Sequence, residues 1–340
     1  MLARGRGRSE QIAMKQRRLG ARGPLTGAIG FGAMPLSGVY GSVSDKDGLA
    51  TLRKAIDLGV TLIDTADIYG DGRNEQLVGR AVAGHRDTLV VATKFGSGFN
   101  EDGSSGGRGR PELVRPAIEA SLRRLALDHV DLFYLHRVDP TTPIEETVGA
   151  MADLVTAGLI RFIGLSEAGP QTLRRAHRVH PITALQTEYS LLTRDPEENV
   201  IPVARELGIG FVAYSPLGRG ILSGAIQSSS DLAADDWRAT VPRFQGANLE
   251  GMISLGQEFR AIASGLTMTP AQLALAWLLC QGPDIVPIPG TRSAKNLELN
   301  SRAADITLEA ATVSRLDRLF PVGAVGGDRY PPGSIERINL

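Results

Sequence analysis

Ionisable side chains stand at the ends of three apolar runs in this sequence. VTLID ends at Asp64 and is soon followed by Tyr69, LVVATK ends at Lys94, and DLFYLH ends at His136. A strand buried on both faces has no reason to end in a charged side chain unless that side chain finds a partner, because desolvating an unpaired charge is costly. Asp64 is the natural partner of Lys94, so we expect these side chains to meet at one rim of the fold.

The elements that must position them form a regular alternation. Short apolar runs alternate with stretches of helical period, such as 45–58 and 112–125, which favours a parallel sheet with crossover helices. The strand candidates are residues 28–34, 61–65, 88–94, 130–136, 162–166, 184–189, 210–215 and 285–289. About eight βα units favour a closed (β/α)8 TIM barrel, in which catalytic groups sit where strands end. An open doubly wound sheet is the alternative.

Composition excludes several classes of function. The 340 residues are 42% hydrophobic, and 37 Lys and Arg balance 37 Asp and Glu, so no global positive field points to nucleic acid or an anionic membrane. The single cysteine, Cys280, fits a reducing cytosol, and we expect it to fill the core. No membrane span, signal peptide or metal-ligand set is evident, which predicts a cytoplasmic protein.

The chain is expected to form one domain over residues 14–340. Residues 1–13 carry arginines among glycines and offer almost nothing to bury, so we expect them to be disordered. Translation starting at Met14 and an idle tail are two explanations of this segment, and an Arg-rich transit peptide is a third. A short N-terminal β-hairpin should lead into the first strand, and extra loops and helices should lie at the C-terminal side.

Seven motifs together resemble the aldo-keto reductases, which are NAD(P)H-dependent carbonyl reductases built on a barrel. In order they are LIDTADIYG, VVATK, DLFYLHR, FIGLSE, LQTEYS, AYSPLGRG and PIPGTRSAKNLELN. The resemblance extends from about residue 18 to residue 300. It implies that Asp64, Tyr69, Lys94 and His136 form a catalytic tetrad, with the cofactor extended along the barrel mouth.

The chemistry of these four residues is consistent with that role. A carbonyl that accepts hydride develops negative charge on oxygen, and Tyr69 can neutralise it with a proton. Lys94 would make that proton easier to release, Asp64 would keep the lysine ionised, and His136 would donate to the carbonyl and orient the substrate. The alternative is a structural Asp64 and Lys94 ion pair beside a packed tyrosine and a core histidine.

A second segment suits a nicotinamide and its diphosphate. The chain lacks a GxGxxG followed by an acidic ribose ligand, so a Rossmann site is not expected. Instead, one strand ends in Tyr214, whose ring would stack on the nicotinamide. Ser215 and backbone amides near Leu217, Gly218 and Gly220 would meet the diphosphate. A glycine-rich surface turn is the other interpretation.

The resemblance implies further cofactor contacts. Ser166 and Gln186 would hold the nicotinamide carboxamide, whereas Glu167 stands where many family members carry asparagine and could accept but not donate. The contacts implied elsewhere are Gly32, Met34, Asp64, Gly290, Thr291, Arg292 and Asn300. Arg292 lies at a helix start, which suits the 2′-phosphate of NADPH, so NADPH/NADP is the expected cofactor. The alternative is that the charged residues at this helix start contact only solvent.

Loops should recognise a small-molecule carbonyl substrate. Tyr40 and Phe99 are candidate apolar walls, together with Tyr69 and His136. Residues 96–110 resemble a flap, and residues 222–248, with Trp237 and Phe244, and 322–340, with Tyr330, are further candidates. These loops mildly favour an aldehyde or ketone with an apolar or aromatic body.

Two other classes of function stay open beside the reductase. One is a cofactor-binding regulatory subunit, which a missing tetrad residue would have favoured. The other is a lyase with Lys94 as a Schiff-base amine. The neighbouring Asp64 opposes the lyase, because a carboxylate raises the pKa of an amine. The sequence does not define an oligomeric state.

Overall fold

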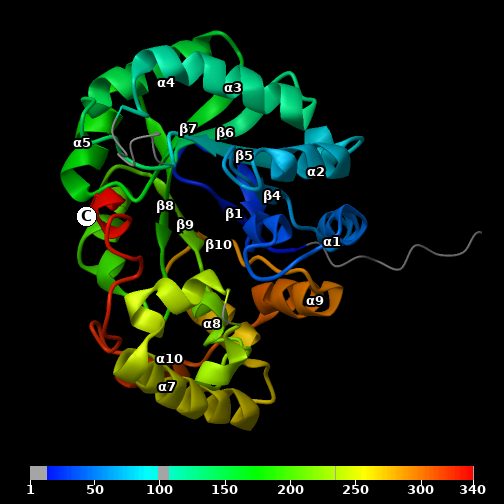
Figure 1. Cartoon of the computed structure of the whole chain (residues 1–340), viewed down its shortest axis with the longest axis vertical. Helices are drawn as coiled ribbons and strands as arrows, with labels where there is room; N and C mark the ends of the chain where they lie inside the picture. The colour runs from blue at the N-terminus through cyan, green and yellow to red at the C-terminus, as the bar shows by residue number, and fades with distance from the viewer. Residues whose placement is uncertain (1–13, 99–106, 234, 340) are drawn as a thin grey trace, which may run out of the picture.

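The computed structural model describes residues 14–98, 107–233 and 235–339. Among these residues, eight parallel strands form one sheet that curls into a barrel surrounded by helices (Figure 1). The strands, in their order around the sheet, are β3 (Phe31–Gly32), β4 (Leu62–Asp64), β5 (Val90–Phe95), β6 (Val130–Leu135), β7 (Ile160–Ser166), β8 (Ile182–Glu188), β9 (Gly210–Tyr214) and β10 (Ile285–Pro287). The predicted (β/α)8 barrel is confirmed, and each predicted strand overlaps one of these.

The first and last strands come together without side chains between them. The Gly30 amide donates to the Pro287 carbonyl at 2.9 Å, which joins the two edges of the sheet. A Cβ on Gly32 would lie 2.8 Å from the Ile288 carbonyl oxygen, and one on Gly290 would lie 2.5 Å from the Gly32 carbonyl oxygen. Glycine is therefore required where the barrel closes.

The predicted N-terminal hairpin is present and seals one end of the barrel. Strands β1 (Gln16–Arg18) and β2 (Leu25–Gly27) pair antiparallel. The Arg17 guanidinium donates to three carbonyls near β10, those of Leu279, Gly282 and Ile285. Leu19 is fully buried among side chains that fill the barrel interior: Leu62, Val90, Ala92, Leu132, Tyr134, Ala184, Val212, Val286 and Ile288.

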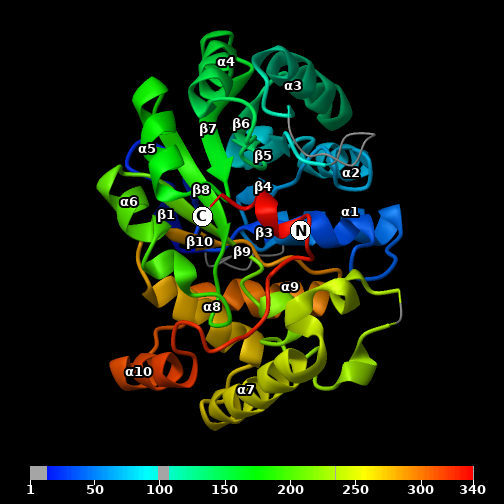
Figure 2. The same ribbon diagram turned by 60° about the vertical axis from the view of Figure 1, so that its left-hand side comes forward.

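Helices cover the outside of the sheet (Figures 1 and 2). They are α1 (Asp45–Asp57), α2 (Arg73–Val82), α3 (Pro111–Leu125), α4 (Ile144–Thr156), α5 (Pro170–Val179), α6 (Val200–Glu206), α7 (Gly246–Gly265), α8 (Pro270–Cys280), α9 (Ala294–Arg302) and α10 (Ala310–Leu319). Side chains cap the starts of α1, α8 and α9; at α1, Ser44 Oγ accepts from the Asp47 amide at 3.1 Å. Apolar faces such as Leu52 and Ala55 of α1 join the core between helices and sheet.

Two expectations about single residues are wrong. Cys280 is the last residue of α8 and is exposed, so it does not fill the core. Phe244, a candidate substrate-loop residue, is buried in the hydrophobic core instead. Among the described residues, no single helix is long and apolar enough to cross a membrane. Helices α7 and α8 meet the length and composition only as a pair, bent by 90°.

The C-terminal segment returns from α10 to the strand ends. Figure 2 shows it in red, running from α10 back toward β8. Asn339 forms a parallel bridge with Ala168, its amide donates to the Glu167 carbonyl at 3.1 Å, and its Oδ1 accepts from the Gly169 amide at 3.0 Å. The segment is thereby tied to the chain between β7 and α5.

Candidate active site

The four predicted rim residues come from three neighbouring strands. Asp64 is the last residue of β4, Lys94 lies near the end of β5, and His136 directly follows β6. Because β4, β5 and β6 are parallel neighbours, their carboxyl ends share one edge of the barrel. Tyr69 lies in the loop between β4 and α2, so the fold brings all four together.

A buried asparagine holds the loop that carries Tyr69. Asn74, in the first turn of α2, accepts from Thr65 Oγ1 at 2.7 Å. Its Nδ2 donates to the Ala33 carbonyl and to Ser37 Oγ, at 2.9 and 2.8 Å. Asn74 thus ties the loops after β3 and β4 to each other. Asn74 was not predicted as a site residue, although it follows LIDTADIYG closely.

Lys94 is the centre of the rim. Its side chain is fully buried, and Nζ donates to Asp64 Oδ1 at 2.5 Å, to the Thr65 carbonyl at 2.7 Å and to Tyr69 Oη at 3.5 Å. Burial is the largest single influence and lowers the pKa of Lys94, but Asp64 and Tyr69 together raise it by more, so the net shift is upward. Lys94 is therefore an ammonium ion, which opposes its use as a Schiff-base amine.

Tyr69 is half-buried, and its hydroxyl faces the lysine. Burial raises the pKa of Tyr69, and the Lys94 ammonium counteracts this shift without reversing it. The phenol therefore stays protonated at neutral pH. Lys94 lowers the pKa of Tyr69, as expected, but burial raises it by more.

His136 completes the rim as a neutral imidazole. Its ring lies edge-on to the Tyr69 ring, with centroids 5.9 Å apart. Burial, reinforced by repulsion from Arg137, Lys94 and Arg337, lowers the pKa of His136 well below 6.5. A neutral imidazole can donate one N–H to a ligand in the cavity.

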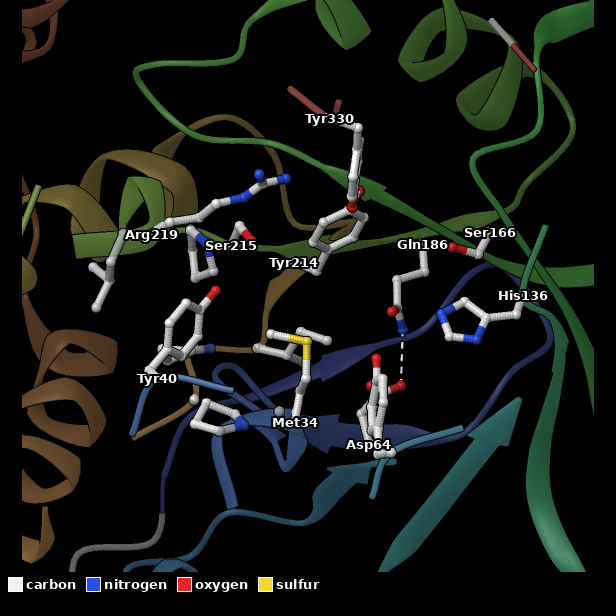
Figure 3. Close-up of a pocket in the computed structure, with 18 of the residues that line it drawn as sticks. Met34, Tyr40, Asp64, His136, Ser166, Gln186, Tyr214, Ser215, Arg219 and Tyr330 are labelled. Atoms are coloured by element: carbon white, nitrogen blue, oxygen red, sulfur yellow. Dashed lines mark hydrogen bonds between the residues drawn. The ribbon is translucent and has the colours of Figure 1, made fainter. Parts of the chain in front are cut away.

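These residues line a cavity of about 400 Å³ at the barrel mouth (Figure 3). Gln186 Nε2 donates to Asp64 Oδ2 at 2.8 Å, and the two side chains lie beside His136 and Ser166 in the close-up. Predicted site residues that line the cavity are Gly32, Met34, Tyr40, Asp64, Tyr69, His136, Ser166, Gln186, Tyr214, Ser215, Leu217, Gly220 and Gly290. Lys94 lies directly behind Asp64 and Tyr69, and Phe99 is outside the described residues.

Glu167 is not among the cavity-lining residues, contrary to its predicted role. Its backbone adopts φ 51°, and its fully buried carboxylate accepts from Tyr214 Oη at 2.6 Å and from Arg329 at 3.2 Å. A rare left-handed conformation for a side chain of this size gives it a different direction from Ser166. We therefore leave Glu167 out of the proposed cofactor site and assign it to the support of Tyr214.

Four other predicted cofactor residues also lie outside the cavity lining. Gly218, with φ 57°, packs against Leu192, and Thr291 Oγ1 accepts from the Ser293 amide at 3.1 Å. Arg292 is exposed and donates to the Ser42 carbonyl at 3.0 Å. Asn300 is buried, with an Oδ1 that has no hydrogen-bond partner. Arg292 and Asn300 thus lie beyond the mapped cavity, near the start and end of α9.

Most of the charged side chains that line the cavity were not among the predicted site residues. Arg137, Arg219, Arg238 and Arg337 line the cavity together with Ser97 and Ser334. Arg219 pairs with Glu188, Arg238 pairs with Asp236, and their guanidinium groups lie over the rings of Trp237 and Tyr40, respectively. Arg137 and Arg219 lie inside the motifs DLFYLHR and AYSPLGRG, so their place in these motifs could have identified them as site residues. Nothing local marks Arg337 or Ser334.

The fold and this rim define a (β/α)8 barrel with a buried lysine and histidine, and a half-buried tyrosine, gathered at the mouth. A sequence profile of the aldo/keto reductase family matches residues 28–320. The chain is 44% identical over 330 residues to a probable aldo-keto reductase of Glycine max, covering 95% of this chain and 94% of the relative. The chain belongs to the aldo/keto reductase family, whose members are oxidoreductases that use NADP(H).

Solved structures agree with this membership. A glycerol dehydrogenase from Gluconobacter oxydans superimposes with a TM-score of 0.81 at 29% identity, covering 92% of this chain and 98% of the other. An aldo/keto reductase from Klebsiella pneumoniae, in complex with NADP and acetate, gives 0.72 at 29% identity, covering 94% and 99%. The family predicted from the motifs is confirmed.

Proposed function

We propose that this protein reduces aldehydes or ketones to alcohols with NADPH, and that Tyr69 is the proton donor. The observation that carries the proposal is the position of Lys94 Nζ, which contacts both Asp64 and Tyr69 within one buried cluster. A structural ion pair needs no tyrosine hydroxyl beside it, and Tyr69 also lines the cavity.

The cavity residues fit a nicotinamide cofactor, which when bound supplies the hydride. Ser166 and Gln186 offer a hydroxyl and an amide to a carboxamide group, and the Tyr214 ring lies beside them (Figure 3). Tyr214 is fixed for stacking because its hydroxyl is bonded to Glu167 and Tyr330. Ser215, Leu217 and Gly220 line the same cavity farther along, as a diphosphate site would require.

The chain's own residues handle the proton. His136 donates an N–H to the carbonyl oxygen, which orients the substrate and withdraws charge from oxygen. Tyr69 then transfers its hydroxyl proton to that oxygen as negative charge develops. Lys94 stabilises the resulting phenolate, and Asp64 holds Lys94 in place.

Arg292 is the proposed contact for the 2′-phosphate. It projects from the loop before α9 and is exposed, so a phosphate can reach it. Its hydrogen bond to the Ser42 carbonyl places it near the loop between β3 and α1. Its partner is a neutral carbonyl, so the charge of Arg292 is available to an anion.

The test is oxidation of NADPH by the purified protein with a set of aldehydes and ketones, followed at the nicotinamide absorbance band. We expect carbonyl-dependent oxidation, faster with NADPH than with NADH at equal subsaturating concentration. Tight NADPH binding, seen by tryptophan fluorescence, without turnover of any carbonyl would favour the regulatory subunit. Absence of binding would contradict the proposed function altogether.

A further inference from the structure

Arg137 is a cavity-lining cation that the proposed reduction does not use. It directly follows His136, and its guanidinium group spans the ends of β6 and β7 and the C-terminal segment. Nη1 donates to the His136 carbonyl at 2.7 Å and to Ser166 Oγ at 3.2 Å, and Nη2 donates to Tyr330 Oη at 3.3 Å. The Tyr330 ring centroid lies 5.8 Å from the guanidinium carbon. These contacts fix the direction of the group.

All three acceptors of Arg137 are neutral. Within the described residues, Arg137 forms no ion pair, whereas the other cations Lys94, Arg219 and Arg238 pair with Asp64, Glu188 and Asp236. A guanidinium has five N–H donors, so two remain without an acceptor among residues 14–98, 107–233 and 235–339. A half-buried cation with spare donors is stabilised by an anion from the cavity.

The charged groups near Arg137 include Arg337 and the buried carboxylate of Glu167, which pairs with Arg329 rather than with Arg137. Arg337 lines the same cavity, and its Nη2 donates to Ser97 Oγ at 2.9 Å. Burial lowers the pKa of Arg337, and repulsion from Arg137 lowers it further. Arg137 and Arg337 also both help to lower the pKa of His136, so two arginines act on the residue that faces the carbonyl. This end of the cavity therefore attracts negative charge.

The cofactor's phosphates do not account for this positive end. Under the proposed function they lie near Ser215, Gly220 and Arg292, where Arg219 and Arg238 supply charge. Arg137 instead stands beside His136 and Tyr69, where the substrate carbonyl is placed. A planar guanidinium fork matches the geometry of a carboxylate better than that of a neutral group.

We propose that Arg137 is a specificity-determining residue that selects carbonyl substrates carrying a carboxylate. The inference rests on the proposed function and adds the substrate class to it. The carbonyl of such a substrate lies at Tyr69 and His136, and its carboxylate accepts from the spare N–H donors of Arg137. Tyr330 and Ser166 hold the guanidinium in place for that contact.

The test compares 4-carboxybenzaldehyde with its methyl ester, which differ by one negative charge. We expect wild-type protein to favour the acid by about tenfold in kcat/KM, the effect of one charge-assisted hydrogen bond. In Arg137→Met the preference should fall to about one, and Arg137→Lys should retain part of it. Arg115 is an exposed arginine of α3 that pairs with Glu119, and Arg115→Met should keep the wild-type preference.

Binding provides a second readout that needs no turnover. Benzoate titrated into the NADP complex should bind about tenfold more weakly to Arg137→Met than to wild type. The NADPH dissociation constant, from tryptophan fluorescence, should change by less than about threefold. A weaker NADPH complex with unchanged benzoate binding would assign Arg137 to the carboxamide and overturn the proposal. A preference that survives Arg137→Met, or no preference in wild type, would also overturn it.

Failure of the proposed function gives a different result. If neither the acid nor the ester oxidises NADPH, the reductase assignment fails, whatever the charge of the substrate. If both are reduced equally, the reductase assignment stands and only the role of Arg137 is lost.

Discussion

The two ends of the proposed substrate and cofactor site are built by different means. At the catalytic end, strands β4, β5 and β6 place Asp64, Lys94 and His136, and Lys94 is fully buried and held by three oxygens. At the end near α9, Arg292 projects from a loop, is exposed, and bonds to one backbone carbonyl. Under the proposed function, the sheet would preorganise the proton chemistry, whereas the choice between NADPH and NADH would depend on a loop residue.

The largest expected effect is at the catalytic end. Tyr69→Phe removes the proposed proton donor while leaving the ring in place. We expect kcat for carbonyl reduction to fall about 10²- to 10⁴-fold. The NADPH dissociation constant should stay within about threefold of wild type, because the phenol is needed only for the proton. Turnover within tenfold of wild type would contradict the role of Tyr69.

The seam where the barrel closes should be the next most sensitive position. Gly32→Ala adds a Cβ against the Ile288 carbonyl, and we expect unfolding free energy to fall by about 1 to 3 kcal/mol. Gly149→Ala, inside α4 with no atom within 4 Å of the added Cβ, should instead raise it by about 0.5 to 1 kcal/mol. Urea unfolding measures both, and equal changes would show that the close approach at Gly32 is relieved at little cost.

A smaller effect is expected at the α9 end. Arg292→Ala should weaken NADPH binding about tenfold through loss of a charge-assisted contact, with little change for NADH. Arg302→Ala is a matched control, because Arg302 is an exposed arginine at the other end of α9 and pairs with Glu298. Equal weakening of both cofactors by Arg292→Ala would mean that Arg292 does not contact the 2′-phosphate.

The smallest expected effect is that of pH between about 6.5 and 10. Reduction needs protonated Tyr69 and neutral His136, and burial raises the pKa of Tyr69 above 10.0 while lowering that of His136 well below 6.5. The kcat for reduction should therefore be flat across this range and fall only at higher or lower pH. A midpoint near pH 8, measured after subtraction of enzyme-free NADPH loss, would contradict these assignments.

The strands of the barrel, and the site residues at the ends of those strands, could be predicted from the sequence. Apolar runs located all eight strands, and polar residues at their ends located Asp64, Lys94 and His136, because the carboxyl ends of parallel strands share one edge. The motifs identified the family, which the comparisons confirm. The catalytic roles of these residues stay a prediction for the experiments above.

The remaining features depend on backbone direction and on distant segments. Glu167 follows Ser166 directly, yet its positive φ turns its side chain into a buried pair with Arg329, which residue type alone does not predict. Tyr330 reaches Tyr214 and Arg137 from the far end of the chain. Sequence periodicity does not predict these contacts, because they depend on how the C-terminal segment crosses the strand ends.

The hairpin at the opposite end of the barrel has a consequence for isotope exchange. Leu19 and the carbonyl contacts of Arg17 close that end, so solvent reaches the Lys94 ammonium through the cavity mouth rather than from below. The exchange rate of the Lys94 ammonium protons with deuterated water should therefore report on access of solvent through the cavity mouth. A molecule bound against Tyr69 should slow this exchange, whereas loosening of the hairpin should accelerate it.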